Sequence, residues 1–332
     1  MTSQRSQHNI MVSVSCVAYN HESYIKDAIE GFLLQKTDFP IEIFVHDDAS
    51  ADRTADIIRE YEKKYPELIT GIYQTVNQYS QGKKPSPEFV WPRCRGKYIA
   101  VCDGDDYWTD PYKLQKQVDF LESNPEYGLV YGDVDSFYEK NKKYLKSKNR
   151  SLRIATPSGH VFEELLLWGF IPALTVLFRK ELWDRFAASE DKKFLDGSLI
   201  GDYVLWLKFS QETKFYYMDE VLGVYREIEE SMIHSRDAKK RIKMFECQSA
   251  IRSYFIGRYG CRSETQAAIT TDYNRLLLRE RSLMCEHEKA KSNFSNIAGP
   301  TFDDYLYLAG SRNILFLFLI RVLIKLKRPW TA

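Results

Sequence analysis

The sequence predicts an α/β protein built on a mostly parallel mixed sheet with helices on both faces. Apolar runs at residues 11–18, 41–45 and 68–74 are short and rich in β-formers, which is typical of buried strands. Between them, residues 25–33 and 55–65 repeat apolar side chains at helical spacing. Strand and helix thus alternate from the first residues, and this order indicates right-handed crossovers that place the strands parallel.

The connections between these elements carry the first polar side chains of interest. Ser50 is a natural N-cap for the second helix, which Pro66 ends. Residues 77–95 form a polar loop that is long for a simple connection, and such loops are often functional. Two readings stay open for its basic residues, contact with a diphosphate or plain solvation: Lys83, Lys84, Arg93 and Arg95.

The stretch that organises the chain is a short strand followed by a cluster of acids. Residues 98–102 are apolar, and they lead into Asp103, Asp105 and Asp106, with Gly104 between the first two acids. Such carboxylates cannot lie unpaired in a core, because burying each charge costs several kcal/mol. At the carboxyl end of a strand they form an oxygen-rich site for Mg²⁺ or Mn²⁺. The alternative is a solvated acidic turn that caps the next helix.

The second half continues the same alternation. In order, we expect a helix at 109–124, a strand at 127–138, a hairpin or loop at 139–150, a helix at 162–168, a strand at 174–178, a helix at 181–186 and strands at 215–217 and 221–225. Before the last strands, Gly201 and Asp202 open a further helix. Because aspartate is favoured at a helix start, capping is one reading of Asp202.

Composition narrows the class of protein. The chain has 332 residues with 47 basic and 46 acidic side chains, so no global charge favours nucleic acid as a partner. Its six cysteines include no CxxC pair, which fits reduced thiols. The first ten residues lack an apolar signal-peptide core, and no apolar run reaches 18 residues. We therefore expect a cytoplasmic protein.

Two regions are expected, a sheet domain at 10–235 and a helical region at 236–332. Ser263 with Gln266 predicts a capping box in the helical region. Residues 314–330 combine an apolar run with a basic face and a tryptophan, as in helices that lie at the inner face of the cell membrane. The alternatives are docking on the protein's own core or on a second copy in a homodimer.

The acid-rich segments together resemble glycosyltransferase family 2. The resemblance covers about residues 10–235, and its motifs are residues 13–20, residues 46–54, the DGDDYW stretch at 103–108, and Gly201-Asp202 with Leu205-Trp206. It implies the GT-A fold, which is Rossmann-like, and an inverting transfer. The continuation after Trp108 is similar to bacterial enzymes that build surface polysaccharides. The expected donor is a nucleotide-sugar with UDP as its nucleotide, and the expected acceptor is a saccharide or lipid-linked saccharide.

The resemblance also implies roles for individual residues. Asp48 would accept a hydrogen bond from the N3–H of uracil, and cytosine would leave that carboxylate unpaired. The implied nucleotide-binding residues are Tyr19, Asn20, Glu22, Asp48, Lys97 and Asp103. The implied metal ligands for Mn²⁺ or Mg²⁺ are Asp105 and His234, supported from behind by Asp106, Trp108 and Arg226. The sequence departs from the family in two places, since no histidine closely follows Tyr225-Arg226 and the loop at 77–95 lacks the usual glycines.

Asp202 is the predicted catalytic base. An acceptor hydroxyl is a weak nucleophile, so its proton must move to a positioned carboxylate as the new bond forms. In-line attack opposite the leaving diphosphate would invert the anomeric centre without an enzyme nucleophile.

Three other classes compete with a transferase. A sugar nucleotidyltransferase would carry a glycine-rich basic loop where this chain has residues 19–22. A haloacid-dehalogenase-type phosphatase would normally continue its Asp-x-Asp with Thr or Val, where this chain has Asp106 and Tyr107. A non-catalytic saccharide- or nucleotide-binding protein would bind the nucleotide and the metal without releasing sugar.

Overall fold

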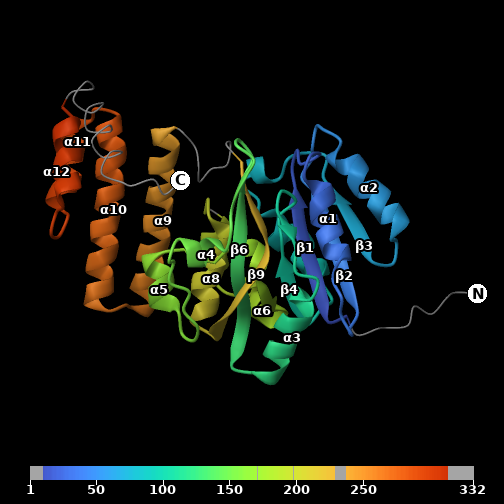
Figure 1. Cartoon of the computed structure of the whole chain (residues 1–332). Helices are drawn as coiled ribbons and strands as arrows, with labels where there is room; N and C mark the ends of the chain where they lie inside the picture. The colour runs from blue at the N-terminus through green and yellow to red at the C-terminus, as the bar shows by residue number, and fades with distance from the viewer. Residues whose placement is uncertain (1–9, 170, 197, 229–236, 313–332) are drawn as a thin grey trace, which may run out of the picture. The chain divides into compact units, whose positions relative to one another are not determined.

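The computed structural model describes residues 10–169, 171–196, 198–228 and 237–312 (Figure 1). They fall into two compact units. The first contains the described residues of 10–165 and 169–228, and the second contains 166–168 and 237–312.

Within the described part of the first unit, nine strands form one sheet in the order β3-β2-β1-β4-β8-β6-β9-β5, with β7 paired to β6 (Figure 1). The strands are β1 (Val12–Ala18), β2 (Ile41–Asp47), β3 (Ile69–Tyr73), β4 (Tyr98–Val101), β5 (Tyr107–Trp108), β6 (Tyr127–Tyr138), β7 (Lys143–Leu145), β8 (Leu177–Arg179) and β9 (Lys214–Glu227). Strands β3, β2, β1 and β4 are parallel, so their carboxyl ends share one edge. The predicted α/β class is confirmed.

Helices connect and flank these strands. They are α1 (Ile25–Leu33), α2 (Thr54–Lys64), α3 (Lys113–Ser123), α4 (Lys148–Ser151), α5 (Phe162–Leu167), α6 (Lys180–Ala187), α7 (Lys192–Asp196) and α8 (Gly201–Ser210). The loop expected at 77–95 contains three short helical turns, η1 (Tyr79–Gln81), η2 (Ser86–Val90) and η3 (Trp91–Arg93), and a fourth, η4 (Ala173–Thr175), precedes β8. Trp91 is 2% exposed, so the segment 77–95 is anchored in the core and is more than a polar connection.

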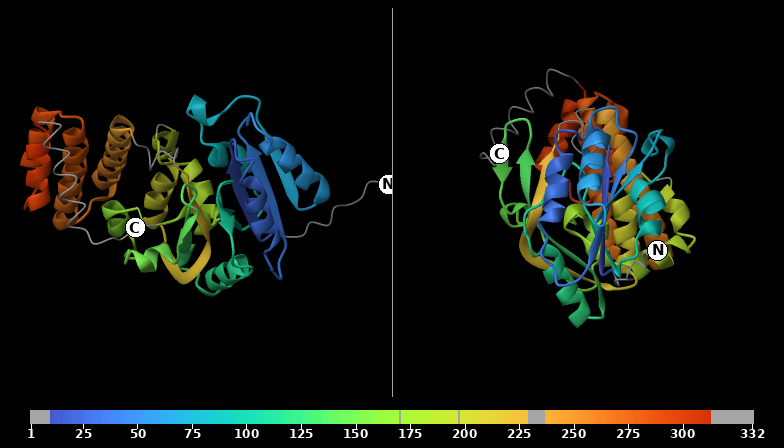
Figure 2. Two further views of the ribbon diagram at one scale, coloured as in Figure 1. Left: turned by 45° about the horizontal axis from the view of Figure 1, so that its top comes forward. Right: turned by 90° about the vertical axis from the view of Figure 1, so that its right-hand side faces the viewer.

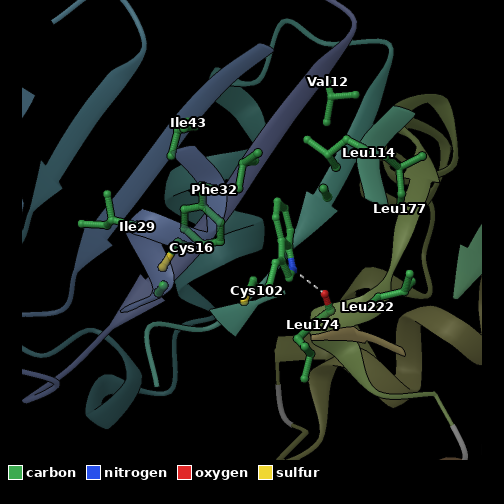
Figure 3. Packing of buried hydrophobic residues seen from close by; sticks show 14 of the residues in the cluster. Val12, Cys16, Ile29, Phe32, Ile43, Cys102, Leu114, Leu174, Leu177 and Leu222 are labelled. Atoms are coloured by element: carbon green, nitrogen blue, oxygen red, sulfur yellow. Dashed lines mark hydrogen bonds between the residues drawn. The ribbon is translucent and has the colours of Figure 1, made fainter. Parts of the chain in front are cut away.

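The core lies between the parallel strands and α1. Figure 3 shows Val12, Cys16 and Phe32 among its side chains, all fully buried. Burial raises the pKa of the Cys16 and Cys102 thiols well above the usual value, with the nearby acids adding to the effect. These two thiols therefore stay protonated and belong to the core rather than to the site.

The end of the acidic stretch is fastened tightly to this core. Trp108 is 1% exposed, and its indole Nε1 donates a hydrogen bond of 2.7 Å to the carbonyl oxygen of Leu174, dashed in Figure 3. Its ring meets that of Phe32 edge-on at 4.8 Å. On α1, a Cβ at Gly31 would lie 2.9 Å from both the backbone nitrogen and the carbonyl oxygen of Trp108. Only glycine allows the helix to approach the strand this closely.

Two predicted helix caps are wrong. The second helix begins at Thr54, not after Ser50, because the Asp52 carboxylate accepts the Thr54 amide at 3.0 Å. The Ser50 hydroxyl instead accepts the amide of Asn20 across the neighbouring loop at 2.9 Å. Ser263 is itself the first residue of α10 and makes no capping hydrogen bond, so no capping box forms there.

The strands predicted at 215–217 and 221–225 are one strand, β9. Its polar centre is accommodated by shifts in the register of the pairing between β6 and β9 around Gly132 and Asp133. Bulges of this kind let a strand continue past residues that break the alternating pattern. In contrast, the bounds predicted for β6 are those observed, and the hairpin expected after it is formed by β7.

The second unit is helical and contains α9 (Ala238–Tyr259), α10 (Ser263–Leu283), α11 (His287–Ser295) and α12 (Phe302–Gly310), in which α10 packs against the other three (Figures 1 and 2). A capping box that the sequence reading missed joins Thr301 and Asp304 at the start of α12. None of the helices in the described residues is long and apolar enough to cross a membrane. The segment 314–330 lies outside the described residues.

Candidate active site

A cavity of about 750 Å³ opens where the parallel strands end. Tyr19 follows β1, Asp48 follows β2, and Asp103 and Asp105 follow β4, so the shared carboxyl edge brings these four side chains to its wall. Asp202, at the start of α8, lines the same cavity although it is nearly a hundred residues further along the chain. The fold therefore gathers the three acidic segments that the sequence singled out.

Asp48 holds the wall of this cavity in place. Its side chain is 1% exposed, and its two carboxylate oxygens accept the backbone amides of Gln78 and Tyr79 at 2.8 and 3.0 Å. These bonds fasten η1 to the end of β2. Because each carboxylate oxygen has two lone pairs, further acceptor capacity is left for a ligand. The turn-forming role considered from the sequence is thus present, and it does not exclude the ligand role.

Asn20 and Glu22 use their side chains to join two loops of the protein. The Asn20 side-chain oxygen accepts the amide of Ala51 at 2.9 Å, and a Glu22 carboxylate oxygen accepts the amide of Arg53 at 3.0 Å. Neither side chain lines the cavity, whereas Tyr19 between β1 and these residues is 45% exposed on its wall. Asn20 and Glu22 therefore join the loops after β1 and β2 and are not among the described residues that line the cavity.

The carboxylates of Asp103 and Asp105 line the cavity and receive little stabilisation from other side chains. Within the described residues, neither carboxylate accepts a hydrogen bond; the imidazole Nε2 of His21 lies 4.0 Å from Asp105 Oδ2. Desolvation by the surrounding protein raises the pKa of Asp103 to about 7, and the charges of Asp105 and Asp202 add to this. Like charges held close together are stabilised by a bound cation.

His21 is a cavity residue that the sequence reading did not select. Its Nδ1 is buried and has no hydrogen-bond partner in the described part of the chain. Burial lowers the pKa of His21, although Asp105 and Asp52 oppose the shift, so the imidazole is held neutral. A neutral imidazole is the form that binds a metal ion. The only feature of the sequence that could have indicated His21 as a site residue is its position directly after Tyr19 and Asn20.

These residues fit a metal ion that is shared with a ligand. Among the described residues, no group of three or more His, Cys, Asp or Glu side chains is arranged to hold a metal by itself. Mg²⁺ and similar ions are, however, commonly bound by one or two carboxylates together with substrate phosphates. Asp105, with His21 beside it, matches that second kind of site.

Asp106 and Arg226 lie behind the acidic loop. The Asp106 carboxylate accepts the backbone amide of Arg226 on β9 at 2.9 Å. The Arg226 guanidinium forms ion pairs with Asp27 and with Glu139, and it packs 4.8 Å from the ring centre of Tyr107. Because Arg226 is 8% exposed and held from several sides, it is a rigid anchor for the loop. These contacts agree with supporting roles for both residues.

Asp202 opens α8 with its carboxylate towards the cavity. Its Oδ1 accepts the amide of Tyr203 at 2.8 Å, while the residue before the helix, Ile200, provides no side-chain cap. Asp202 is exposed on the cavity wall; desolvation by the surrounding protein raises its pKa, and the backbone hydrogen bonds and the charge of Lys84 oppose that shift. The carboxylate thus stabilises the helix start and is also available to a ligand.

Of the four basic residues in the segment 77–95, only Lys84 reaches the cavity. Lys83 pairs with Glu88 at 3.3 Å, Arg95 pairs with Glu42 at 2.7 Å, and the Arg93 guanidinium donates to the carbonyl oxygen of Phe89.

One further predicted site residue, Lys97, is not among the described residues that line the cavity. Lys97 precedes β4, at the opposite end of the strand from Asp103, and its ammonium group pairs with Glu122 at 2.6 Å. The structure therefore removes Lys97 from the candidate nucleotide-binding set. His234 lies outside the described residues.

Comparison with known proteins places this site in a family. The model described as Glycosyl transferase family 2 matches residues 13–186, which include Tyr19, Asp48, Asp103 and Asp105. An uncharacterized protein of Mycobacterium tuberculosis is 32% identical over 235 residues, which are 69% of this chain and 62% of that protein. The match thus spans less than two thirds of that relative. The Bacillus subtilis protein TuaG, named for teichuronic acid biosynthesis, is 26% identical, with 76% of this chain and 92% of TuaG covered.

Two solved structures share the fold. TarS 1–349 of S. aureus, in complex with UDP-GlcNAc, has a TM-score of 0.53 at 15% identity, with 86% of this chain and 89% of that chain covered. The mannosyltransferase PcManGT from Pyrobaculum calidifontis, in complex with GDP-Man and Mn²⁺, has a TM-score of 0.57 at 17% identity, with coverage of 96% and 84%. The family model covers more than half of the sequence, and the chain belongs to glycosyl transferase family 2.

Proposed function

We propose that this protein is an inverting, metal-dependent glycosyltransferase that moves a sugar from a nucleotide-sugar to a saccharide acceptor. The observation that carries the proposal is the meeting of Asp103, Asp105 and Asp202 on the wall of one cavity. Two of these acids would serve the donor and the third the acceptor. Family membership, and a fold shared with two proteins that were crystallised with the nucleotide-sugars UDP-GlcNAc and GDP-Man, support the same reaction class.

The donor would bind along the carboxyl edge of the parallel strands. Tyr19 offers an exposed ring to the base, Asp48 offers its remaining lone pairs to an imide N–H, and Asp103 offers its carboxylate to the ribose hydroxyls. A base with an N3–H suits Asp48, and we therefore propose a UDP-sugar. TarS is crystallised with UDP-GlcNAc and PcManGT with GDP-Man, so the two structural relatives differ in their base.

A divalent ion, Mn²⁺ or Mg²⁺, would supply the charge that stabilises the departing diphosphate. Asp105 would hold it, with His21 as the neighbouring nitrogen ligand, and Asp106 and Arg226 would keep the loop in place. The raised pKa of Asp103 supports this assignment, because a cation at Asp105 would relieve the repulsion between the two acids. PcManGT, which shares the fold, was crystallised with Mn²⁺.

Asp202 would take the proton of the acceptor hydroxyl as that oxygen attacks the anomeric carbon. The sugar–diphosphate bond breaks as the sugar–oxygen bond forms, the nucleoside diphosphate leaves with the bonding electron pair, and the configuration inverts. A raised pKa suits this role, since a base works best when its pKa lies nearer the operating pH.

The acceptor would be a saccharide, free or lipid-linked, of a bacterial surface polysaccharide. The match to TuaG, named for teichuronic acid biosynthesis, supports this class of pathway. Residues 314–330 would bring the enzyme to the inner face of the cell membrane, as their apolar run and basic face suggest.

A panel of UDP-, GDP- and dTDP-sugars with Mn²⁺, scored for nucleotide release, tests the proposal. We expect release from a UDP-sugar and loss of that release when EDTA removes the metal. Asp202→Asn should lower turnover about 10²–10⁴-fold while UDP still binds. Full activity in Asp202→Asn would remove this residue from the base role. Binding of UDP with Mn²⁺ but no release from any donor would favour a non-catalytic binding protein.

A further inference from the structure

Lys84 is a buried cation that the proposed reaction does not yet use. Among the described residues that line the cavity, it is the single lysine or arginine. It is only 9% exposed, and lysine is almost never buried unless its charge is compensated. Its ammonium group donates a hydrogen bond to the carbonyl oxygen of Ser198 and lies 5.5 Å from the ring centre of Tyr79.

One end of Lys84 contacts the segment that presents Asp202. Ser198 lies four residues before Asp202, and Gly201 is the first residue of α8. A Cβ built on Gly201 would lie 3.5 Å from Lys84 Cδ, so the lysine stem packs along the start of the helix. Lys84 therefore contacts the backbone of the segment that leads into α8 and Asp202.

The other end of Lys84 is held by the loop that faces the nucleotide. The Lys84 amide donates to Glu88 at 2.8 Å, and the Glu88 amide donates to the Lys84 carbonyl oxygen at 2.9 Å. Tyr79, beneath the ammonium group, donates its own amide to Asp48. A continuous series of contacts thus runs from Asp48 through Tyr79 and Lys84 to the start of α8.

The positive charge of Lys84 also affects Asp202, because it lowers the pKa of that carboxyl group. The other ionisable groups on the cavity wall are His21, Asp48, Asp103, Asp105, Tyr19 and Tyr79. Desolvation disfavours the ionised form of Asp202 and so raises its pKa, while backbone hydrogen bonds and the positive charge of Lys84 oppose that shift.

We infer that Lys84 is a positioning residue for the catalytic base. It ties the start of α8 to the loop held by Asp48 and supplies the positive charge that keeps Asp202 ionised. This inference rests on the proposed role of Asp202, and it adds a physical connection between the nucleotide-facing loop and the base.

The test compares Lys84→Met and Lys84→Arg with the control Lys83→Met, using the donor with the highest turnover in the panel. Lys83 is adjacent and exposed, and it also contacts Glu88. In Lys84→Met we expect kcat to fall by about 10²-fold with little change in donor KM. The acid limb of the kcat profile should move to higher pH by about one unit. Lys84→Arg should restore the limb, and Lys83→Met should leave it unchanged.

A rise in donor KM with an unmoved acid limb would overturn the inference, because Lys84 would then be a donor-binding residue. Should Lys84→Met fail to fold, Lys84→Gln retains a hydrogen-bond donor for Ser198 without the charge. Its acid limb should shift in the same direction, and an unshifted limb overturns the inference as well.

Amide hydrogen exchange of residues 198–203 without any donor provides a readout that does not depend on turnover. We expect faster exchange in Lys84→Met, or in Lys84→Gln, than in Lys83→Met. Equal exchange in these variants would overturn the positioning role. Absence of turnover from every donor in the wild-type protein would instead count against the proposed function.

Discussion

Two acid-rich loops lie at the same edge of the sheet, and the protein surrounds their carboxylates very differently. After β2, Asp48 accepts two backbone amides, and Asp52 accepts the amides of Thr54 and Glu22. After β4, Asp103 and Asp105 accept no hydrogen bond from the described residues. In the first loop, Asp48 and Asp52 thus have protein donors, whereas no donor among the described residues reaches the carboxylates of Asp103 and Asp105 in the second.

Asp52 in the first loop and Asp103 in the second each show a pKa shift, and the two shifts have opposite directions for this reason. Burial alone would raise the pKa of Asp52, but hydrogen bonds from Thr54 and Glu22 lower it below its usual value. Desolvation and the neighbouring acids raise the pKa of Asp103 to about 7. Carboxylates satisfied by protein donors stabilise the fold, while unsatisfied ones in a cavity indicate a functional site.

The largest effect is expected at Asp105, where the contrast between the two loops predicts loss of function without loss of stability. Asp105→Asn should lower metal-dependent turnover by about 10³-fold or more, because the metal supplies several kcal/mol to the departure of the diphosphate. The melting temperature should not fall. Asp56→Asn, an exposed acid on α2, is the control and should change neither quantity. Metal-dependent turnover that persists in Asp105→Asn would contradict the assignment.

At Asp52 we expect the reverse, loss of stability. Asp52→Ala removes the acceptor at the start of α2 and should lower the free energy of unfolding by about 1–2 kcal/mol. Because the folded-state pKa of Asp52 is lowered, its contribution is present above the unfolded pKa of about 4 and is lost as pH falls below it. Urea unfolding should therefore show a larger difference from wild type at pH 7 than at pH 3. An equal difference at both pH values would place the effect elsewhere.

Asp103→Asn should raise stability, with the opposite pH dependence. The folded-state pKa of Asp103, about 7, lies above its unfolded value, so ionisation destabilises the folded protein as pH rises from about 4 to 7. Because Asp103 is exposed on the cavity wall, solvent screening reduces this effect. Without metal, the melting temperature of Asp103→Asn should exceed that of wild type by about 2–4 °C at pH 8 and match it at pH 4. A lower melting temperature at pH 8 would show that Asp103 is satisfied by the protein.

Lys97 should show the smallest effect. Its ion pair with Glu122 is about half exposed on both sides, and such pairs contribute about 1 kcal/mol or less. Lys97→Met should therefore leave the donor KM unchanged and lower the free energy of unfolding only slightly. A marked rise in donor KM would return Lys97 to the binding site.

Local pattern was sufficient for much of this fold and for the gathering of the acids. β6 follows from a stretch at residues 127–138 that is rich in Tyr, Val and Phe, and Asp48, Asp103 and Asp105 meet because parallel strands end at one edge. Lys84 and His21 could not be selected in the same way. Their roles depend on contacts with segments that are distant in sequence, and spacing along the chain does not predict those contacts.

The predictions that failed share a related cause. Ser50 has the right chemistry for a cap, but its hydroxyl is used by Asn20, thirty residues away. Lys97 adjoins the acidic stretch in sequence, yet the length of β4 separates the two in space. Residues that are neighbours in a strand motif can thus belong to opposite edges of the sheet.

The close approach of Gly31 to Trp108 has a consequence for how variants of this protein should be read. A single methyl group on Gly31, on the side of α1 that faces Trp108, would push the backbone at the end of the acidic loop, although residue 31 is not on the cavity wall. Inactive variants at this position would therefore report a displaced loop rather than a lost chemical group. Excess metal or donor should restore the activity of these variants only if its binding returns the acidic loop to its original position.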